Sequence, residues 1–243
     1  MIELAAIRFD LDGAVHDRFV TLVDPEVPLD PMVTAITGLS DQDLRGQPTA
    51  EMALRQFRAW LGEDRLLAAH NAGFDVNLLG WECDRAQLPI MRWRVVDTLH
   101  CAKALGTPGG LSLAAQREAY GWDDLHAHRA EPDAEAVLRL VLHAQRELPA
   151  QRFAAIAQGS RMRGRWRHPR SLPPAWADLP ALIDAGERIH FVYTDRAGRR
   201  SERAVTPYGY AEVGGRLRFH GWCHLREERR NFAAERSALQ ALA

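Results

Sequence analysis

Three short polar segments in the first half of the chain carry side chains of the kind that hydrolyse phosphodiester bonds. The segments are His-Asn-Ala-Gly-Phe-Asp at 70–75, Val-Asp-Thr-Leu at 96–99 and His-Arg-Ala-Glu-Pro-Asp at 128–133. Carboxylates such as Asp75 and Asp133 are hard oxygen ligands that suit Mg²⁺ or Mn²⁺. A histidine such as His128 can take a proton from an attacking water at neutral pH. If the segments converge in one cleft, two metal ions about 3.5–4 Å apart would hold the attacking and leaving oxygens of a phosphodiester.

Each of these residues alone has a plainer explanation. An aspartate at the start of a helix, such as Asp75, usually caps that helix, and a single histidine before a helix is usually structural or exposed. His126 is a useful comparison, because it lies two residues from His128 without any spacing that favours chemistry. The prediction therefore depends on the ordered set of segments and on the elements between them.

Strands and helices alternate through residues 1–149 in the predicted pattern. Strands are predicted at 2–9, 18–23, 65–69 and around 95–96, and helices at 49–61, 73–87, 98–105, 112–120 and from 132 onward. Asp12-Gly13 predicts a hairpin turn, and Ser40 with Asp43 resembles a capping box. This alternation predicts an α/β domain built on a sheet at 1–148.

The pattern changes after residue 149. Prolines and glycines scattered through 149–180 predict a linker, with some helix near 150–158. Beyond it, apolar and polar residues alternate in short runs around 189–194 and 216–220, and Gly214-Gly215 marks a turn. Residues 181–243 are therefore predicted to form a small β-barrel or meander.

The net charge of −1 conceals an asymmetry between the two halves. Residues 1–149 hold 14 basic and 23 acidic side chains, net −9, whereas residues 150–243 hold 17 and 9, net +8. Lys103 is the only lysine, and arginine suits phosphate binding and stacking on bases. The linker arginines at 161, 163, 165 and 167 alternate with smaller or apolar residues. They fit either a solvated basic linker or an extended segment that follows phosphates while Trp166 stacks on a base.

Composition excludes several classes of protein. With 243 residues, 47% hydrophobic and 26% charged, the chain is typical of a globular protein. No apolar run approaches the roughly 20 residues of a membrane span, and no secretory leader opens the chain. Cys83, Cys101 and Cys223 form neither a metal knuckle nor a disulfide framework. We therefore expect a cytoplasmic protein without a membrane partner.

The three polar segments, taken together, resemble the DEDDh 3′–5′ exonucleases, the family of the proofreading epsilon subunit of bacterial DNA polymerase III. A fourth match is the segment Thr-Ala-Ile-Thr-Gly-Leu-Ser-Asp at 34–41. The resemblance covers residues 1 to about 146 and implies a ribonuclease-H-like mixed sheet flanked by helices. It also implies that Asp75 and Asp133 hold Mg²⁺ or Mn²⁺ at a two-metal site, that His128 is the general base, and that Asn71 and Thr37 contact substrate.

The family's first motif, an Asp-x-Glu on the first strand, has no clear counterpart. Asp10-Leu11-Asp12 is one candidate, and Phe9 to Gly13 also resembles the nucleophile strand of haloacid-dehalogenase-type phosphatases. Register argues against both, because 2–9 resembles the family's second strand and 19–25 its third. Asp10 and Asp12 then fall in the hairpin between those strands.

Without the first strand, two of the family's four metal carboxylates are missing. Asp75 and Asp133 carry −2 against the +4 of two divalent ions, which predicts that two metals bind weakly. Backbone groups beside the missing central strand would also be left unpaired in the core. Two explanations are open: Met1 is an internal residue of a longer frame, or the domain is a degenerate nuclease kept for binding. We favour the first, since the other motifs are intact.

The second half resembles a WYL domain, a small Sm-like (SH3-like) β-barrel, over about 181–240. Its arginines at 226, 230 and 236 fall on the pattern CxxRxxxRxFxxDR, whereas the name-giving Trp-Tyr-Leu is here Leu217-Arg218-Phe219. The resemblance implies that Arg218, Arg226, Arg230 and Arg236 bind single-stranded nucleic acid or a nucleotide-like ligand. On a strand, Arg216, Arg218 and His220 would share one face, with Leu217 and Phe219 packed inward.

Two functions follow from these patterns. The first is a metal-dependent 3′–5′ exonuclease acting on the 3′ end of DNA or RNA, with the second half holding or sensing a single strand. A DNA polymerase is a further partner that the resemblance implies. The alternative is a catalytically impaired nucleic-acid or nucleotide sensor, because the Asp-x-Glu motif is absent.

Overall fold

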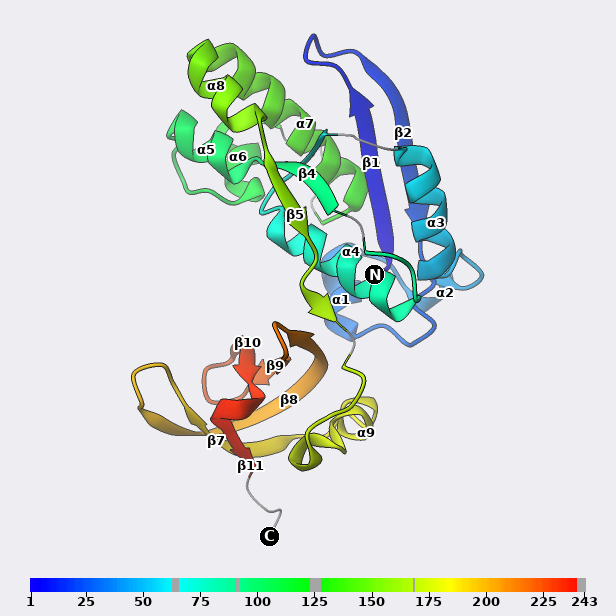
Figure 1. Cartoon of the computed structure of the whole chain (residues 1–243), viewed down its shortest axis with the longest axis vertical. Helices are drawn as coiled ribbons and strands as arrows, with labels where there is room; N and C mark the ends of the chain where they lie inside the picture. The colour runs from blue at the N-terminus through cyan, green and yellow to red at the C-terminus, as the bar shows by residue number, and fades with distance from the viewer. Residues whose placement is uncertain (63–65, 91, 123–127, 168, 240–243) are drawn as a thin grey trace. The chain divides into compact units, whose positions relative to one another are not determined.

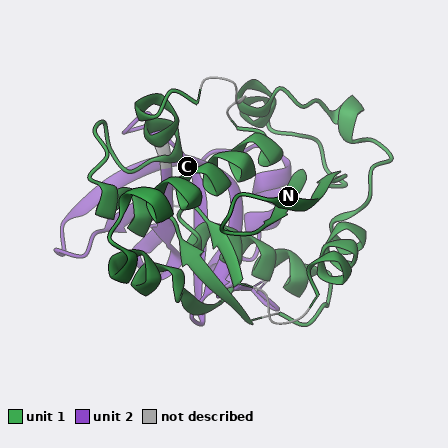
Figure 2. Ribbon diagram, turned by 90° about the horizontal axis from the view of Figure 1, so that it is seen from above, with its two compact units in different colours: residues 1–164 green, residues 165–243 purple. Residues whose placement is uncertain are grey.

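The computed structural model covers residues 1–243 and describes all of them except 63–65, 91, 123–127, 168 and 240–243 (Figure 1). His126 lies outside the described residues. The chain divides into two compact units, residues 1–164 and 165–243, which Figure 2 colours green and purple. Among the described helices, none combines the length and the apolar composition that crossing a membrane requires.

Unit 1 has the alternating strands and helices that the sequence predicts. Its strands are β1 (Glu3–Phe9), β2 (Val15–Leu22), β3 (Leu66–Ala69), β4 (Arg92–Asp97) and β5 (Ser160–Arg163). Its helices are α1 (Pro31–Thr37), α2 (Asp41–Leu44), α3 (Ala50–Leu61), α4 (Gly73–Arg85), α5 (Leu99–Leu105), α6 (Leu113–Ala119), α7 (Ala130–Glu147) and α8 (Ala150–Ala157). The capping box of Ser40 and Asp43 is confirmed at the start of α2. Helix α7 begins at Ala130, so Pro132 lies inside its first turn and not at its first position.

The strands of unit 1 form two separate sheets. β1 and β2 make an antiparallel hairpin, with Asp12 and Gly13 in the turn as predicted. β3 pairs in parallel with β4, and β5 adds to the other edge of β4 in the antiparallel sense. Helix α7 packs against both β1 and β3. The sequence predicts a single mixed sheet, but the structure divides it in two. Among the described strands, β1 pairs only with β2, and β3 pairs only with β4.

A cavity of about 930 Å³ lies against both of these strands. Its lining comes from β1, from β3 and β4, and from α3, α4 and α7, and most of it is apolar. Trp93 lies on this lining, and its buried Nε1–H has no hydrogen-bond partner among the described residues. The expectation of unpaired backbone groups beside a missing strand stays a prediction, because the Trp93 Nε1–H belongs to a side chain.

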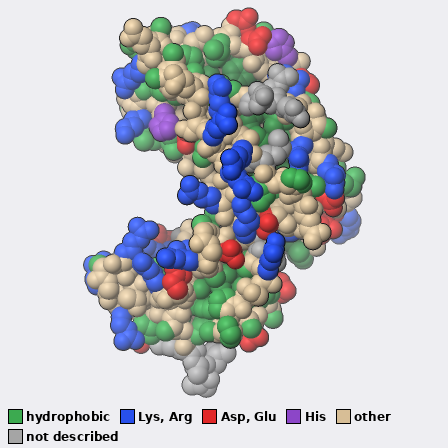
Figure 3. Space-filling model, in the orientation of Figure 1, with side chains coloured by type: hydrophobic (Ala, Val, Ile, Leu, Met, Phe, Trp, Pro, Cys, Tyr) green, Lys and Arg blue, Asp and Glu red, His purple; other side chains and the backbone are tan. Residues whose placement is uncertain are grey.

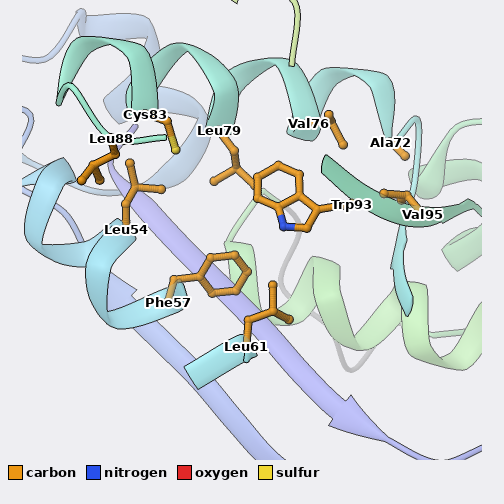
Figure 4. Packing of buried hydrophobic residues seen from close by; sticks show 10 residues of the cluster. All are labelled: Leu54, Phe57, Leu61, Ala72, Val76, Leu79, Cys83, Leu88, Trp93 and Val95. Carbon is orange, nitrogen blue, oxygen red and sulfur yellow. The ribbon is translucent and has the colours of Figure 1, made fainter. Parts of the chain in front are cut away.

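The main core of unit 1 lies between α3, α4 and β4 (Figure 4). Apolar residues recur along α3 at helical spacing and bring Leu54, Phe57 and Leu61 to one face. Figure 4 shows these side chains directed toward Trp93 of β4 and toward the apolar face of α4. This packing fixes where α4 begins, and α4 carries Asp75 in its first turn.

Two glycines let α4 approach the end of β5 closely. A Cβ at Gly80 would lie 2.7 Å from the Gly164 Cα, and a Cβ at Gly164 would lie 2.5 Å from the Val76 carbonyl oxygen. We expect Gly80→Ala to lower the free energy of unfolding by about 1–3 kcal/mol, because the backbone must move to admit the methyl group. Urea denaturation measures the change. Gly73→Ala is the control, since a Cβ there meets nothing within 4 Å; equal stability of the two variants would contradict the prediction.

Unit 2 is built on one antiparallel sheet. Its elements are β6 (Trp166–Arg167), η1 (Pro174–Trp176), α9 (Leu179–Asp184), β7 (Ile189–Thr194), β8 (Arg200–Val213), β9 (Arg216–Cys223), β10 (Glu228–Ala233), η2 (Ala234–Arg236) and β11 (Ser237–Leu239). The strand order is β10-β9-β8-β7-β11, with β6 paired to β8. No pairing joins β10 to β11 within the described residues, so the hydrogen-bonded path is open where a closed barrel would be continuous.

The core of unit 2 is a cluster of aromatic rings. Phe191 is fully buried and contacts Phe219, Phe232 and Trp176 at centroid distances of 5.5, 5.1 and 6.4 Å. The predicted alternation along β9 is confirmed, since Leu217 and Phe219 are buried between more exposed neighbours. The stretch 149–180, expected to be a linker, contains α8, β5, β6 and η1, so much of it pairs with one unit or the other.

Candidate active site

Two of the predicted metal ligands lie at the starts of helices that face the same cavity. Asp75 is in the first turn of α4, and Asp133 is in the first turn of α7. The positive end of each helix dipole favours a carboxylate at this position. Both residues line the cavity beside β1 and β3. The structure thus brings together two side chains that are 58 positions apart in the sequence.

The Asp75 carboxyl is reached by solvent but is surrounded by protein on most sides. Loss of hydration, opposed by a backbone hydrogen bond and assisted by the negative charges of Asp97 and Asp133, raises the pKa of Asp75 to about 6. Neighbouring carboxylates repel one another when they are ionised. A cation bound among them would relieve this repulsion.

This shift has a consequence for stability. The folded chain holds a proton on Asp75 up to about pH 6, whereas the unfolded chain releases it near pH 4. Stability is therefore expected to fall as the pH rises through this window, and Asp75→Asn should be more stable than the wild type at pH 8. Because the side chain is accessible to water, the gain is roughly 1 kcal/mol.

Thermal unfolding at pH 4 and pH 8 in the presence of a chelator measures this difference. The exposed Glu118→Gln variant controls for the loss of one negative charge. A lower melting temperature for Asp75→Asn than for the wild type at pH 8 would contradict the prediction.

Asp133 is paired with an arginine inside the domain. The Arg117 Nη1 donates to Asp133 Oδ1 at 3.1 Å, and Arg117 is only 8% exposed. Burial raises the pKa of Asp133, while the Arg117 charge, the His128 side chain and a hydrogen bond from the His128 backbone lower it. A metal ion at Asp133 would therefore share this carboxylate with Arg117 or displace that contact.

His128 lies at the surface just before α7, as the predicted general base would need to. Its backbone has a φ of 64°, in the left-handed region, which is uncommon for a residue with a side chain. The His128 side chain and backbone are both near enough to lower the pKa of the Asp133 carboxyl. The segment 128–133 therefore brings His128 and Asp133 close together in the structure.

The turn between β3 and α4 is held by side chains of the second polar segment. Asp97 Oδ1 accepts hydrogen bonds from the backbone N–H groups of Asn71 and Leu99, both at 3.0 Å. Both ring nitrogens of His70 are occupied, one by the Thr98 hydroxyl at 2.9 Å and one by a backbone carbonyl. Asn71 is exposed and lines the cavity, whereas His70 and Asp97 position the turn.

One residue of the site was missed by the sequence reasoning. Glu3 of β1 is 8% exposed and lines the cavity. Arg129 donates to both of its carboxylate oxygens at 3.1 and 3.0 Å, and the Ala130 backbone N–H donates at 2.9 Å. Glu3 therefore anchors β1 to the start of α7, which carries Asp133. An acidic residue at the start of a largely apolar strand was the available signal.

Of the other sequence candidates in unit 1, Asp10 lines the cavity, whereas Asp12 and Thr37 do not. The Thr37 hydroxyl donates to the Val33 carbonyl at 2.7 Å, and Thr37 does not line the cavity. Asp10 contacts His16 at 2.6 Å, and Asp12 accepts a hydrogen bond from the Ala14 backbone. The hairpin position predicted for Asp10 and Asp12 is thus confirmed.

The described residues do not by themselves form a metal site. They contain no group of three or more His, Cys, Asp or Glu side chains placed to hold a metal ion. The chemistry of Asp75 and Asp133 still suits a divalent cation. Both are hard oxygen donors, and their two negative charges would balance one Mg²⁺ or Mn²⁺. Further ligands would have to be water, substrate phosphate or groups outside the described residues.

The four arginines predicted to bind a ligand in unit 2 do not gather in one place. Arg218 and Arg230 lie on opposite faces of the sheet by their register on β9 and β10, and each contacts a glutamate of its own unit. Arg226 is in the turn after β9, about 17 Å along that strand from Arg218. Arg236 is half-buried in η2. Any shared ligand would have to extend across the sheet.

Comparison with known protein families gives two matches. Residues 1–141 match the family described as Exonuclease, and residues 174–237 match the WYL domain. DNA polymerase III PolC-type of Streptococcus suis (strain 98HAH33) is 35% identical over 144 residues, which are 58% of this chain and 10% of that protein. The PolC-type polymerase of Halalkalibacterium halodurans is 35% identical over 142 residues, with the same coverage. The chain spans about a tenth of the length of these curated relatives.

A solved structure also resembles most of this chain. It is E. coli exonuclease I in complex with a dA16 oligonucleotide, with a TM-score of 0.56 and 16% identity, covering 91% of this chain and 50% of that one. At this identity the likeness concerns the fold alone.

Proposed function

Since the chain belongs to the exonuclease family over residues 1–141, we propose that unit 1 is a metal-dependent nuclease that shortens nucleic acids from the 3′ end. The observation that carries the proposal is the meeting of Asp75 and Asp133 at one cavity, with His128 beside Asp133. Asp75 and Asp133 would hold Mg²⁺ or Mn²⁺, which would stabilise the leaving 3′ oxygen when bound.

The chain's own residues have separate roles in this proposal. His128 takes the proton from the attacking water, since it is exposed at the rim of the site. Asn71 lies on the cavity wall and contacts the substrate. Glu3 and Asp97 keep β1, the β3–α4 turn and the start of α7 in place. Thr37 is further from this cavity and would contact a more distant part of the strand.

The substrate class follows from the relatives. The PolC-type relatives are DNA polymerases by name, and the exonuclease I structure holds a deoxyadenylate strand. Single-stranded DNA or a 3′ end is therefore the proposed substrate, and a polymerase is a proposed partner. Unit 2, with its WYL match, is proposed to be a small barrel whose arginines at 218, 226, 230 and 236 hold the strand or a nucleotide-like ligand.

A gel assay tests the direction of cleavage. The protein is incubated with single-stranded DNA labelled at its 5′ end, in Mg²⁺ or Mn²⁺, and we expect a ladder of shorter labelled products. The same strand with a phosphorothioate as its 3′-terminal linkage should resist shortening. Release of the 5′ label as a mononucleotide would contradict the proposed polarity.

A second function, a nucleic-acid sensor without catalysis, is favoured by one observation. The described residues contain no group of three or more His, Cys, Asp or Glu side chains placed to hold a metal ion, and Asp133 is already paired with Arg117. In that case the protein would bind the labelled strand in a mobility-shift assay and leave it intact. Protein produced from the longest reading frame that contains these residues should be assayed beside the 243-residue chain. Cleavage by the longer protein alone would support the enzyme and show that further ligands are needed.

A further inference from the structure

Four arginines lie on one exposed face of the β4–β5 sheet. In the antiparallel register, Arg92 is opposite Arg163 and Arg94 is opposite Arg161. All four are exposed, whereas Trp93, between two of them, faces the core. In Figure 3, Lys and Arg side chains form a column over the part of unit 1 where Figure 1 draws these strands. We call these residues the arginine quartet.

The arginine quartet is electrostatically uncompensated within the described chain. Side chains directly opposite in an antiparallel pair lie about 4.5–5.5 Å apart at Cβ, and like charges there are destabilising. None of the four guanidinium groups has a described carboxylate within 4 Å, although many other arginines of the chain have one. An anionic ligand that bridges the two strands would remove this repulsion.

The surroundings of the quartet favour a nucleic acid over other anions. Leu66 is opposite Arg94 in the parallel register with β3 and is 44% exposed, so an apolar surface adjoins the cations. Guanidinium groups bind phosphate in a bidentate manner, and a base or sugar can cover an adjacent apolar side chain. None of the four arginines lines the cavity that holds Asp75 and Asp133. Leu66 does line that cavity, so the quartet borders the candidate active site without being part of its lining.

We propose that the arginine quartet binds the phosphates of a single nucleic-acid strand, outside the cavity where the terminal nucleotide is cleaved. This inference extends the proposed function, because it gives a long strand a second point of attachment on the nuclease unit. Two rows of cations on neighbouring strands suit consecutive phosphates of an extended chain. The binding itself does not depend on catalysis.

A binding titration tests the proposal independently of cleavage. Fluorescein-labelled oligothymidylate of about 20 nucleotides is titrated with the Asp133→Asn protein, with and without the changes Arg161→Gln and Arg163→Gln. Fluorescence anisotropy is measured between about 50 and 200 mM salt. We expect the double change to weaken binding about tenfold and to reduce the slope of log K against log salt by about 1.4, since each phosphate contact on a single strand contributes about 0.7.

Matched controls separate this surface from general positive charge. The changes Arg45→Gln and Arg152→Gln remove two exposed arginines of unit 1 that lie outside the quartet. An unchanged slope in the Arg161/Arg163 variant, or an equal loss in the Arg45/Arg152 variant, would overturn the proposal. The quartet variant should also have an unchanged or higher melting temperature at low salt, because the repulsion is relieved. A lowered melting temperature would show that the arginines are structural and would likewise overturn it.

A short substrate distinguishes failure of this inference from failure of the proposed function. The p-nitrophenyl ester of thymidine 5′-monophosphate holds a single phosphate and cannot bridge the four arginines of the quartet. In protein that retains Asp133, the Arg161→Gln and Arg163→Gln changes should leave the hydrolysis of this ester unchanged and raise KM for the oligothymidylate. Absence of hydrolysis in every protein would contradict the nuclease proposal, while the anisotropy result would stand by itself.

Discussion

Replacing Asp133 by asparagine is expected to lower the rate of 3′-end shortening by about 10²–10³-fold, because the change removes one of the two carboxylates predicted to hold the metal. The substitution keeps the size of the side chain and its position in the first turn of α7. The rate is measured on 5′-labelled single-stranded DNA in Mg²⁺ or Mn²⁺ under single-turnover conditions. A loss confined to KM would contradict a role in holding the metal.

Metal binding gives a second measurement for the same variant. A divalent ion that binds the folded chain raises its melting temperature by mass action. We expect Mg²⁺ to raise the melting temperature of the wild type and to leave that of Asp133→Asn unchanged. Glu131→Gln is the matched control, since Glu131 lies in the same turn and contacts Arg18 at the surface. Equal loss of activity in both variants would show that charge near α7, and not ligation at Asp133, is responsible.

Replacing Glu3 by alanine is expected to lower the free energy of unfolding by roughly 2–4 kcal/mol. The change leaves the Arg129 guanidinium and the Ala130 N–H without the carboxylate that accepts three hydrogen bonds from them. Because Arg129 is partly exposed, water replaces some of the lost contacts and the cost stays below that of a fully buried pair. Urea denaturation of the whole chain measures the difference.

The loss of Glu3 should also affect the candidate site. Since Glu3 fixes the start of α7, we expect the variant to retain the family fold by circular dichroism but to cleave DNA more slowly at saturating substrate. Glu51→Ala is the control, because Glu51 pairs with Arg55 on an exposed helix face and contributes less than about 1 kcal/mol. Similar unfolding midpoints for the two variants would contradict the anchoring role of Glu3.

Much of the site was predictable because it rests on local signals. The position of Asp75 at the start of a helix, the Asp12-Gly13 turn and the pairing of His128 with Asp133 all involve residues close in sequence. The two family matches confirm the resemblance derived from the polar segments and from the arginine pattern. The start of α7 was predicted two residues late, because proline is tolerated anywhere in the first turn of a helix.

Contacts between distant segments were not predictable in the same way. Glu3 meets Arg129 across 126 positions, and nothing in the composition of either segment specifies that partner. Arg117 pairs with Asp133 because α6 packs beside α7, which depends on the whole domain. The same is true of the two separate sheets, since pairing between strands is decided by which edges the helices bring together.

The amino-acid sequence alone specifies which acids and which histidine are candidates for hydrolysing a phosphodiester, the order in which they occur, and the division into an acidic and a basic half. Which charges meet depends on the fold. It paired Asp133 with Arg117, anchored Glu3 under α7, and set Arg92 and Arg94 opposite Arg163 and Arg161. The physical reason is that side-chain type and helix or strand period are local properties. The energy of a charge, in contrast, depends on neighbours that only the folded chain supplies.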